Sequence, residues 1–338
     1  MAMGKHILYF TWEKLFLAFL GIVLSFSAKA QTIGQFTLWN QNHYLVNPAA
    51  AGNQEYFDVA LGMRQQWSGI KNAPKTFYAT GHTVLNRPKT HERSAIRVSR
   101  TNKSVYRKQK SFSKPILKHA IGGQLSTLEQ GAFDRTEAVL TYAIHLPINN
   151  GISLSFGLSA GLNSFSFDQT RATVLDNNDP VFNAFVNGEN SNQLNVNAGT
   201  YLYSDQFFVG YSANQLLQNE LEIADIDNPG TGSANLEIQH FLIGGYHFDL
   251  DNDFRLTPNL LIKFSEPGPS FLDLGLNLSY QQLLFFGMNY RTDEVISASV
   301  GVDVSYFLKV GYAYDYTTSD LGGVASGSHE FFVGLKIY

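Results

Sequence analysis

The sequence predicts an all-β chain that closes into a transmembrane antiparallel β-barrel of about 14 strands, of the outer-membrane type. Three observations support this prediction. The first 30 residues have the layout of an export signal, the composition is rich in glycine and aromatic residues, and long segments alternate apolar with small or polar residues. With 29 Gly, 26 Phe and 17 Tyr and only 15% charged residues, the chain is typical of a β protein with a lipid-facing surface.

The N-terminus carries the expected export signal over residues 1–30. Two lysines precede an apolar core, LFLAFLGIVLSF, and the sequence AKA stands just before Gln31. This order is typical of a secretory signal peptide, and we expect cleavage after Ala30. The apolar core is shorter than the ~20 residues of a membrane-spanning helix. The chain contains no Cys, which excludes disulfide frameworks, thiolate metal sites and a lipid anchor on a cysteine.

The alternation is clearest over residues 152–162, ISLSFGLSAGL. Every second residue is apolar, and each residue between is Ser or Gly. The same pattern recurs over 270–281, 294–303 and 305–317. A half-buried strand of a soluble protein usually runs for about 5–6 residues, whereas a tilted membrane strand needs about 9–11. The long runs therefore predict strands with one face toward lipid and the other toward a lumen.

Alternation and turn residues together give fourteen strands, an even number, as bacterial barrels prefer. Short turns such as PINNG, SDQ and QQ join strands at one end, whereas long connections over 168–193 and 216–237 join them at the other. This asymmetry predicts that the short turns face the periplasm. Pro258 is expected to cost one ladder hydrogen bond. The expected strands are 57–66, 75–85, 119–126, 134–146, 152–166, 193–203, 206–215, 237–248, 253–264, 270–281, 283–292, 294–303, 305–317 and 328–338.

The first stretch after the signal, QNHYLVNPAAAGNQEYFDVALGMRQQWSGIKNAPKTFYAT, resembles the opening of the PorP/SprF family. The terminal GSHEFFVGLKIY is similar to that family's closing strand. The resemblance implies an outer-membrane barrel of type IX secretion and gliding machinery that binds and helps deliver or anchor secreted surface proteins such as adhesins. Implied partners are a secreted surface protein or adhesin domain and periplasmic type IX components. The residues that carry the resemblance are Asn47, Pro48, Ala49, Gly52, Arg64, Gln65, Gln66 and Trp67.

We divide the chain into a signal peptide (1–30), an N-terminal lead-in segment (31–56) and a barrel (57–338). Fourteen strands enclose more space than their own side chains fill. The candidate occupants are the lead-in segment, a terminal domain of a partner or a small solute, and we favour a protein occupant. Arg64 shares a strand face with Asp58 and Gln66, which predicts a polar luminal cluster. Aromatic girdles at the two interfaces are expected to include Trp39, Trp67, Tyr78, Tyr246, Tyr290 and Tyr316.

A basic insert over 87–118 interrupts the barrel sequence. It holds eleven Lys or Arg residues and a single acid, Glu92. Three interpretations remain open: a solvated loop, a periplasmic docking element for an acidic partner, and contact with the phosphates of outer-membrane lipid. The compartment and the lack of regular aromatic stacking positions argue against nucleic acid. The basic residues are Arg87, Lys89, Arg93, Arg97, Arg100, Lys103, Arg107, Lys108, Lys110, Lys114 and Lys118.

Catalytic motifs are not apparent, and we expect neither an enzyme nor a cofactor. The nine His are scattered, and the sequence has no HExxH helix, no GxSxG elbow and no P-loop. The alternative function is that of an outer-membrane diffusion channel or a hydrophobic-solute transporter. Such a channel needs an open or gated pore with a charged constriction.

Overall fold

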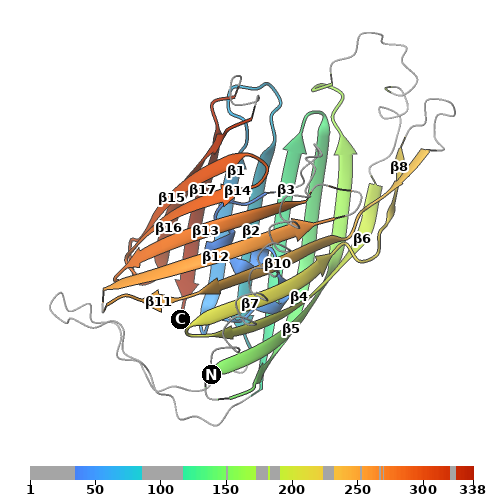
Figure 1. Cartoon of the computed structure of the whole chain (residues 1–338). Coiled ribbons are helices and arrows are strands. Elements are labelled where there is room, and N and C mark those ends of the chain that lie inside the picture. The colour runs from blue at the N-terminus through green and yellow to red at the C-terminus, as the bar shows by residue number, and fades with distance from the viewer. Residues whose placement is uncertain are drawn as a thin grey trace, which may run out of the picture.

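A computed structural model describes residues 35–85, 117–149, 151–172, 182, 191–223, 232–251, 253–265, 268, 270–319 and 325–338. The signal peptide and nearly all of the basic insert lie outside these residues. Fourteen antiparallel strands form a closed ring, because each pairs with a strand on either side and the first strand of the chain pairs with the last (Figure 1). The ring strands are β1 (Phe57–Gln65), β2 (Lys75–Val84), β3 (Lys118–Gln130), β4 (Phe133–Pro147), β5 (Ile152–Phe167), β6 (Ser191–Ser204), β7 (Phe207–Asn214), β10 (Gln239–Tyr246), β12 (Phe254–Phe264), β13 (Phe271–Tyr280), β14 (Leu284–Arg291), β15 (Val295–Asp303), β16 (Leu308–Thr317) and β17 (Ser328–Ile337).

The all-β barrel of about 14 strands is therefore confirmed. Each expected strand corresponds to one ring strand, with boundaries that differ by a few residues. The largest difference is in β3, which continues to Gln130 because its pairing with β4 extends to Phe133. Three short strands were not predicted. They are the two-residue β11 (Phe248–Asp249), which pairs with β12, and the hairpin of β8 (Glu220–Ile223) and β9 (Gly232–Asn235).

Pro258 lies within β12, but it does not interrupt a ladder on both sides. It pairs with Leu276 of β13, whereas the pairing with β10 begins one residue later, at Asn259. The pairing with β11 covers only Arg255 and Leu256. Proline thus occupies the break between two neighbours on one edge of β12, where its missing N–H removes no bond.

The two faces of the wall differ as the alternation predicts. In β5, Ser155 and Ser159 are buried inside the ring, whereas Phe156 and Leu158 are exposed on its outside. Apolar side chains exposed in this way suit contact with lipid. No helix among the described residues is both long and apolar enough to cross a membrane.

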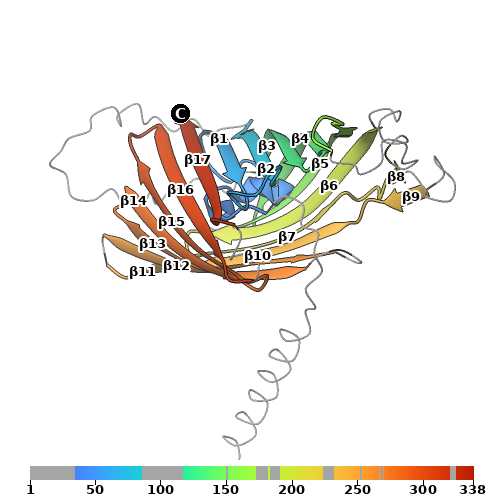
Figure 2. The ribbon, with the colours of Figure 1, turned by 90° about the horizontal axis from the view of Figure 1, so that it is seen from above.

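The two ends of the barrel can be told apart by their connections. We call the end where β1 begins and β17 finishes, at Phe57 and Ile337, the inner end, and the opposite end the outer end. Figure 2 looks down on the ring and shows the N-terminal segment, in blue, inside it. The lumen is therefore occupied, which makes this segment and the wall around it the candidate functional site.

Candidate functional site

Residues 35–56, which we call the luminal segment, cross the barrel interior. The segment contains three 3-10 helices, η1 (Trp39–Gln41), η2 (His43–Leu45) and η3 (Pro48–Ala50). Near the outer end, Gln35 Nε2 donates to Asp293 Oδ2 over 2.8 Å. At the inner end, the rings of Tyr56 and Tyr338 lie 5.3 Å apart. The segment therefore runs from the outer end to the inner end before the chain enters β1.

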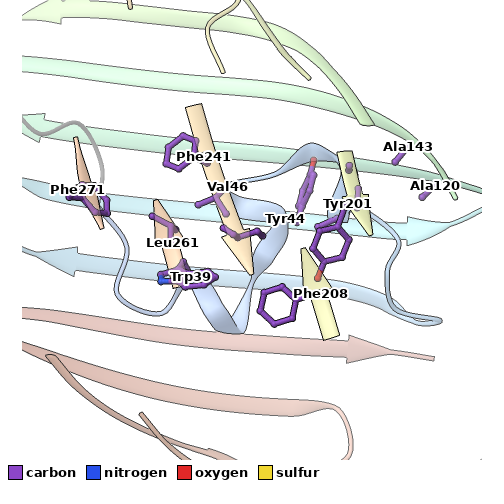
Figure 3. Close-up of a cluster of buried hydrophobic side chains, with 14 residues drawn as sticks. Trp39, Tyr44, Val46, Ala120, Ala143, Tyr201, Phe208, Phe241, Leu261 and Phe271 are labelled. Carbon is purple, nitrogen blue, oxygen red and sulfur yellow. The ribbon is translucent and has the colours of Figure 1, made fainter. Parts of the chain in front are cut away.

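Apolar side chains of the luminal segment pack against both sides of the ring. Trp39, Tyr44 and Val46 share a buried cluster with wall residues (Figure 3). Burying a large apolar side chain stabilises by about 1.5–3 kcal/mol, so this cluster favours the docked segment. The wall residues drawn around them are Ala120, Ala143, Tyr201, Phe208, Phe241, Leu261 and Phe271.

Two aromatic residues were predicted wrongly. Trp39 and Tyr78 were expected in the lipid girdles, but both are buried in the lumen, with exposed fractions of 1% and 0%. Both bury apolar surface against luminal neighbours: Trp39 packs in the cluster of the luminal segment, and the ring of Tyr78 lies edge-on to Phe36. Tyr246, Tyr290 and Tyr316 are exposed, as an interface position requires.

The Asn-Pro-Ala stretch forms the tightest part of the luminal segment. The Asn47 side chain caps η3, since its Oδ1 accepts from Ala49 N over 2.9 Å. Its Nδ2 also donates to the carbonyl of Thr200 on β6 over 2.9 Å. Pro48 occupies the first position of η3, where a missing N–H costs nothing. Asn47 is therefore both a helix cap and a tether to the wall.

Main-chain groups of the luminal segment bond to side chains of several strands. Ser155 Oγ on β5 donates to Ala49 O over 2.7 Å. His145 Nε2 on β4 donates to Ala51 O over 2.8 Å. Gly52 N donates to His82 Nδ1 on β2 over 3.1 Å. The wall therefore satisfies backbone groups that would otherwise be buried without partners.

Gly52 makes a close contact with β3 four residues before the end of the luminal segment. Its φ of +77° is left-handed, and a Cβ there would lie 2.2 Å from the Cβ of Ala120. Both facts require glycine. The family resemblance carried by Asn47, Pro48, Ala49 and Gly52 thus falls on residues whose identity the docked segment needs.

We predict that Gly157→Val on β5 displaces the luminal segment. A Cβ at Gly157 would lie 2.4 Å from Ala49 N and from the carbonyl carbon of Pro48. Overpacking of this kind costs typically 1–3 kcal/mol, so we expect proteolysis of the segment to become about tenfold faster in folded barrels. Gly151→Val is the matched control, because nothing lies within 4 Å of its Cβ position. Equal cleavage in both variants would contradict the docking contact.

Arg64 of β1 forms a buried ion-pair network at the point where the ring closes. Its Nη2 lies 2.6 Å from Asp315 Oδ2 of β16, and its Nη1 lies 3.3 Å from Glu330 Oε2 of β17. The three side chains have exposed fractions of 2%, 1% and 0%. Arg64 therefore points into the lumen and lies in a polar cluster there, as its strand face predicted. We call Arg64, Asp315 and Glu330 the seam triad.

The seam triad also holds the start of the luminal segment. Thr37 N donates to Glu330 Oε2 over 2.7 Å, and Thr37 Oγ1 donates to Asp315 Oδ1 over 2.8 Å. Arg64 Nη1 donates to the same hydroxyl over 2.8 Å. Bonds to charged groups contribute about 1.5–3 kcal/mol each. One buried network therefore joins β1, β16, β17 and the luminal segment.

The residues after Arg64 extend the same seam outward. Gln66 N donates to Pro74 O over 2.9 Å, which closes the β1–β2 connection. The backbone of Trp67 has a left-handed conformation, with φ of 46°, and its N donates to Ser328 Oγ of β17 over 3.2 Å. Gln65 is the last residue of β1, opposite His329 of β17. The Arg-Gln-Gln-Trp stretch thus lies along the β1–β17 seam.

Sequence reasoning missed Thr37, Asp315 and Glu330. A usable signal was present for the two acids, because each is a lone carboxylate on the polar side of an otherwise apolar alternating strand. Of the eleven Lys and Arg residues of the basic insert, only Lys118 is described. It lies at the start of β3, and its Nζ is 3.3 Å from Glu55 Oε1. The other ten lie outside the described residues.

His43 lies on the luminal segment, between the rings of Trp39, Tyr201 and Phe208. Its Nδ1 lies 2.8 Å from the Tyr201 hydroxyl. His43 therefore packs among aromatic rings and also bonds to the wall at β6.

The arrangement is suited to holding a polypeptide segment in the lumen. Within the described residues, no group of three His, Cys, Asp or Glu side chains is placed to hold a metal ion. The polar groups that converge here, Arg64, Asp315 and Glu330, bond to one another and to the luminal segment. We infer no reaction chemistry from them.

Several solved structures align with most of the chain at low sequence identity. The Ralstonia pickettii toluene transporter TbuX aligns with a TM-score of 0.47 and 8% identity, over 87% of this chain and 93% of that chain. The monoaromatic hydrocarbon channel CymD aligns with a TM-score of 0.44 and 11% identity, over 90% and 94%. A Pseudomonas aeruginosa FadL homologue aligns with a TM-score of 0.43 and 9% identity, over 86% and 91%. Among curated proteins, none matches this sequence.

A family model settles the affiliation. The model described as type IX secretion system membrane protein PorP/SprF matches residues 28–335, nearly the whole chain. The match confirms the resemblance carried by the Asn-Pro-Ala and Arg-Gln-Gln-Trp stretches. A closed barrel with a lipid-facing outer surface places such a membrane protein in the outer membrane. The chain therefore belongs to the PorP/SprF family of type IX secretion system membrane proteins.

Proposed function

We propose that the protein is an outer-membrane barrel that binds secreted surface proteins, adhesins among them, and helps to deliver or anchor them. The observation that carries the proposal is the filled lumen. The luminal segment crosses the ring and bonds to β1, β2, β4, β5, β6, β16 and β17. A barrel closed from within is better suited to presenting a binding surface than to conducting solutes. The family affiliation supports the same role.

The orientation follows from the connections. Inner-end turns within the described residues are short: Gln281 and Gln282 are both left-handed in the turn between β13 and β14. The outer-end connections after β5 and β7 span many residues. Outer-membrane barrels have short turns on the periplasmic side and longer loops on the cell surface. We propose that the outer end faces the cell surface, where a secreted protein would bind.

The basic insert joins β2 to β3 and therefore leaves the barrel at the inner end. We propose that it docks an acidic periplasmic component of the secretion machinery, because eleven cations lie in one segment. Deletion of residues 87–116 should remove periplasmic partners from the purified protein and leave surface partners bound. Retention of every partner would favour a solvated loop, and loss of lipopolysaccharide alone would favour lipid contact.

Co-purification tests the proposed function. The protein is tagged at the C-terminus, extracted from its native outer membrane in mild detergent and analysed by mass spectrometry. A second outer-membrane barrel with the same tag is the control. We expect a large secreted surface protein or periplasmic secretion components to be enriched over the control. Repeated recovery of the barrel alone, together with measurable conductance in planar bilayers, would overturn the proposal in favour of a channel.

A further inference from the structure

The outer part of β6 extends beyond its neighbour β7. On one side, β6 pairs with β5 over its full length, from Ser191 to Ser204. On the other side, its pairing with β7 covers only the stretch from Ala198 to Tyr203. Residues 191–197 therefore have a strand on one edge only. We call this stretch the β6 edge.

The chain turns away from the β6 edge after β7. Gln215 is left-handed, with φ of 64°, and ends the regular pairing. Leu216 N then donates to Val196 O over 2.9 Å, and Asn219 Nδ2 donates to Leu194 O. The following strand β8 pairs with β9 and not with β6. Two carbonyls of the edge are thus met by isolated donors rather than by a strand.

These two bonds fix the direction of the edge amides. In an antiparallel strand, the N–H and C=O of one residue point to the same side. The carbonyls of Leu194 and Val196 point away from β5, so their amides do so too. Within the described part of the chain, no backbone group of a turn or loop accepts from either amide, and the ladder with β7 ends at Ala198. The β6 edge therefore presents backbone donors at the two-residue spacing of a strand.

The side chains of the β6 edge alternate between two environments. Leu194 points outward with 65% of its surface exposed, and Leu217 beside it is 47% exposed. Asn195 points inward and is buried, yet neither its amide nitrogen nor its amide oxygen has a partner among the described residues. The same is true of the Nδ2 of the neighbouring buried Asn163. Within this part of the chain, hydrogen-bonding capacity is thus unmet in the lumen behind the edge.

We propose that the β6 edge accepts an extended strand of the secreted partner and thereby adds it to the barrel wall. The inference rests on the proposed function and names the surface that performs it. An added strand would replace the isolated bonds of Leu216 N and Asn219 Nδ2 with evenly spaced backbone groups, which a helix, with its own groups paired, does not offer. Because Leu194 faces outward and Asn195 faces the lumen, the added strand should carry apolar residues on its outer face and polar residues on its inner face. The edge lies at the outer end, on the side proposed to face the cell surface.

Leu194→Pro tests the backbone contact, and Leu194→Ala is its matched control. Proline removes the amide that points to the open edge but no bond of the β5–β6 ladder. Alanine removes the side chain and keeps the amide. We expect Leu194→Pro to reduce the co-purified surface protein by about tenfold or more, since it removes a hydrogen bond and adds a clash, and Leu194→Ala by less than about threefold. Equal retention by both variants would overturn the inference.

A photo-crosslinking residue at position 192 provides a second measurement that does not depend on folding of the proline variant. Asn192 is exposed on the β6 edge; Leu140, exposed on a strand paired on both sides, is the control position. Crosslinks to the surface protein from 192 and not from 140 support the inference. Crosslinks only within the chain, or to a second copy, overturn it.

The same experiment separates the two proposals. If the surface protein co-purifies with the wild-type barrel but crosslinks elsewhere, the β6 edge is wrong and the proposed function stands. If no secreted protein co-purifies with the wild type under conditions that keep the barrel folded, the proposed function fails and the inference fails with it.

Discussion

Deletion of residues 35–53 is expected to convert a barrel that conducts little into an open pore. These residues fill the lumen with buried side chains, among them Trp39 and Tyr44, and no other described segment replaces them there. A fourteen-stranded wall encloses more space than its own side chains fill, so ion conductance should rise by at least about tenfold. Single-channel recording in planar bilayers measures the change.

The deletion needs a control for folding, because the luminal segment also contributes to the core. Folded barrels resist unfolding by detergent at room temperature and migrate differently after heating, so gel mobility reports the ring directly. Gly157→Val, which loosens the segment without removing it, should give transient openings rather than a constant pore. A folded deletion variant with the conductance of the full chain would contradict the role of the segment as a plug.

Arg64→Met should destabilise the barrel more than any other single substitution considered above. Methionine has a similar length but leaves Glu330 buried without its cation and leaves Asp315 with only Arg291, whose Nη2 lies 4.0 Å from Oδ2. Removing one partner of a buried ion pair costs typically 3–5 kcal/mol. We expect the temperature at which the folded band is lost to fall, and the start of the luminal segment to detach, because Thr37 bonds to the same carboxylates.

A compensated variant separates charge from packing. In Arg64→Met with Asp315→Asn and Glu330→Gln, no net charge remains buried in the seam triad, and much of the lost stability should return. Arg64→Lys tests geometry, since a lysine keeps the charge but cannot bond both carboxylates in the same fork. Full stability in Arg64→Met alone would show that the triad does not hold the seam.

The wall of this protein could be predicted from its sequence because lipid imposes a simple rule. Over residues 152–163 of β5 the outward residues are apolar and the inward ones are Ser, Gly or Asn, so period two alone locates the strand and its faces. The rule weakens where the environment is less uniform. The β8–β9 hairpin forms a separate two-stranded sheet and was not predicted, because strands of four residues are too short to show a clear alternation.

The contents of the lumen could be predicted only in outline. The polar face of β1 indicated that Arg64 points inward, but its partners Asp315 and Glu330 lie some 250 residues away along the chain. Their meeting depends on the closure of the ring, which no local pattern encodes. Trp39 and Tyr78 illustrate the same limit. An aromatic side chain suits a lipid interface and a luminal cluster equally, so the residue type alone does not show which of the two it occupies.

The central claim is that the luminal segment occupies the barrel in the native outer membrane, and one crosslink tests it directly. Asn42 Nδ2 donates to Thr80 Oγ1 of β2 over 2.8 Å, and the chain has no cysteine of its own. In Asn42→Cys with Thr80→Cys, a short bis-maleimide applied to intact membranes should join the two positions in most molecules, and neither single variant should react internally. Absence of the crosslink in folded barrels whose two cysteines both react with a single maleimide would contradict the account.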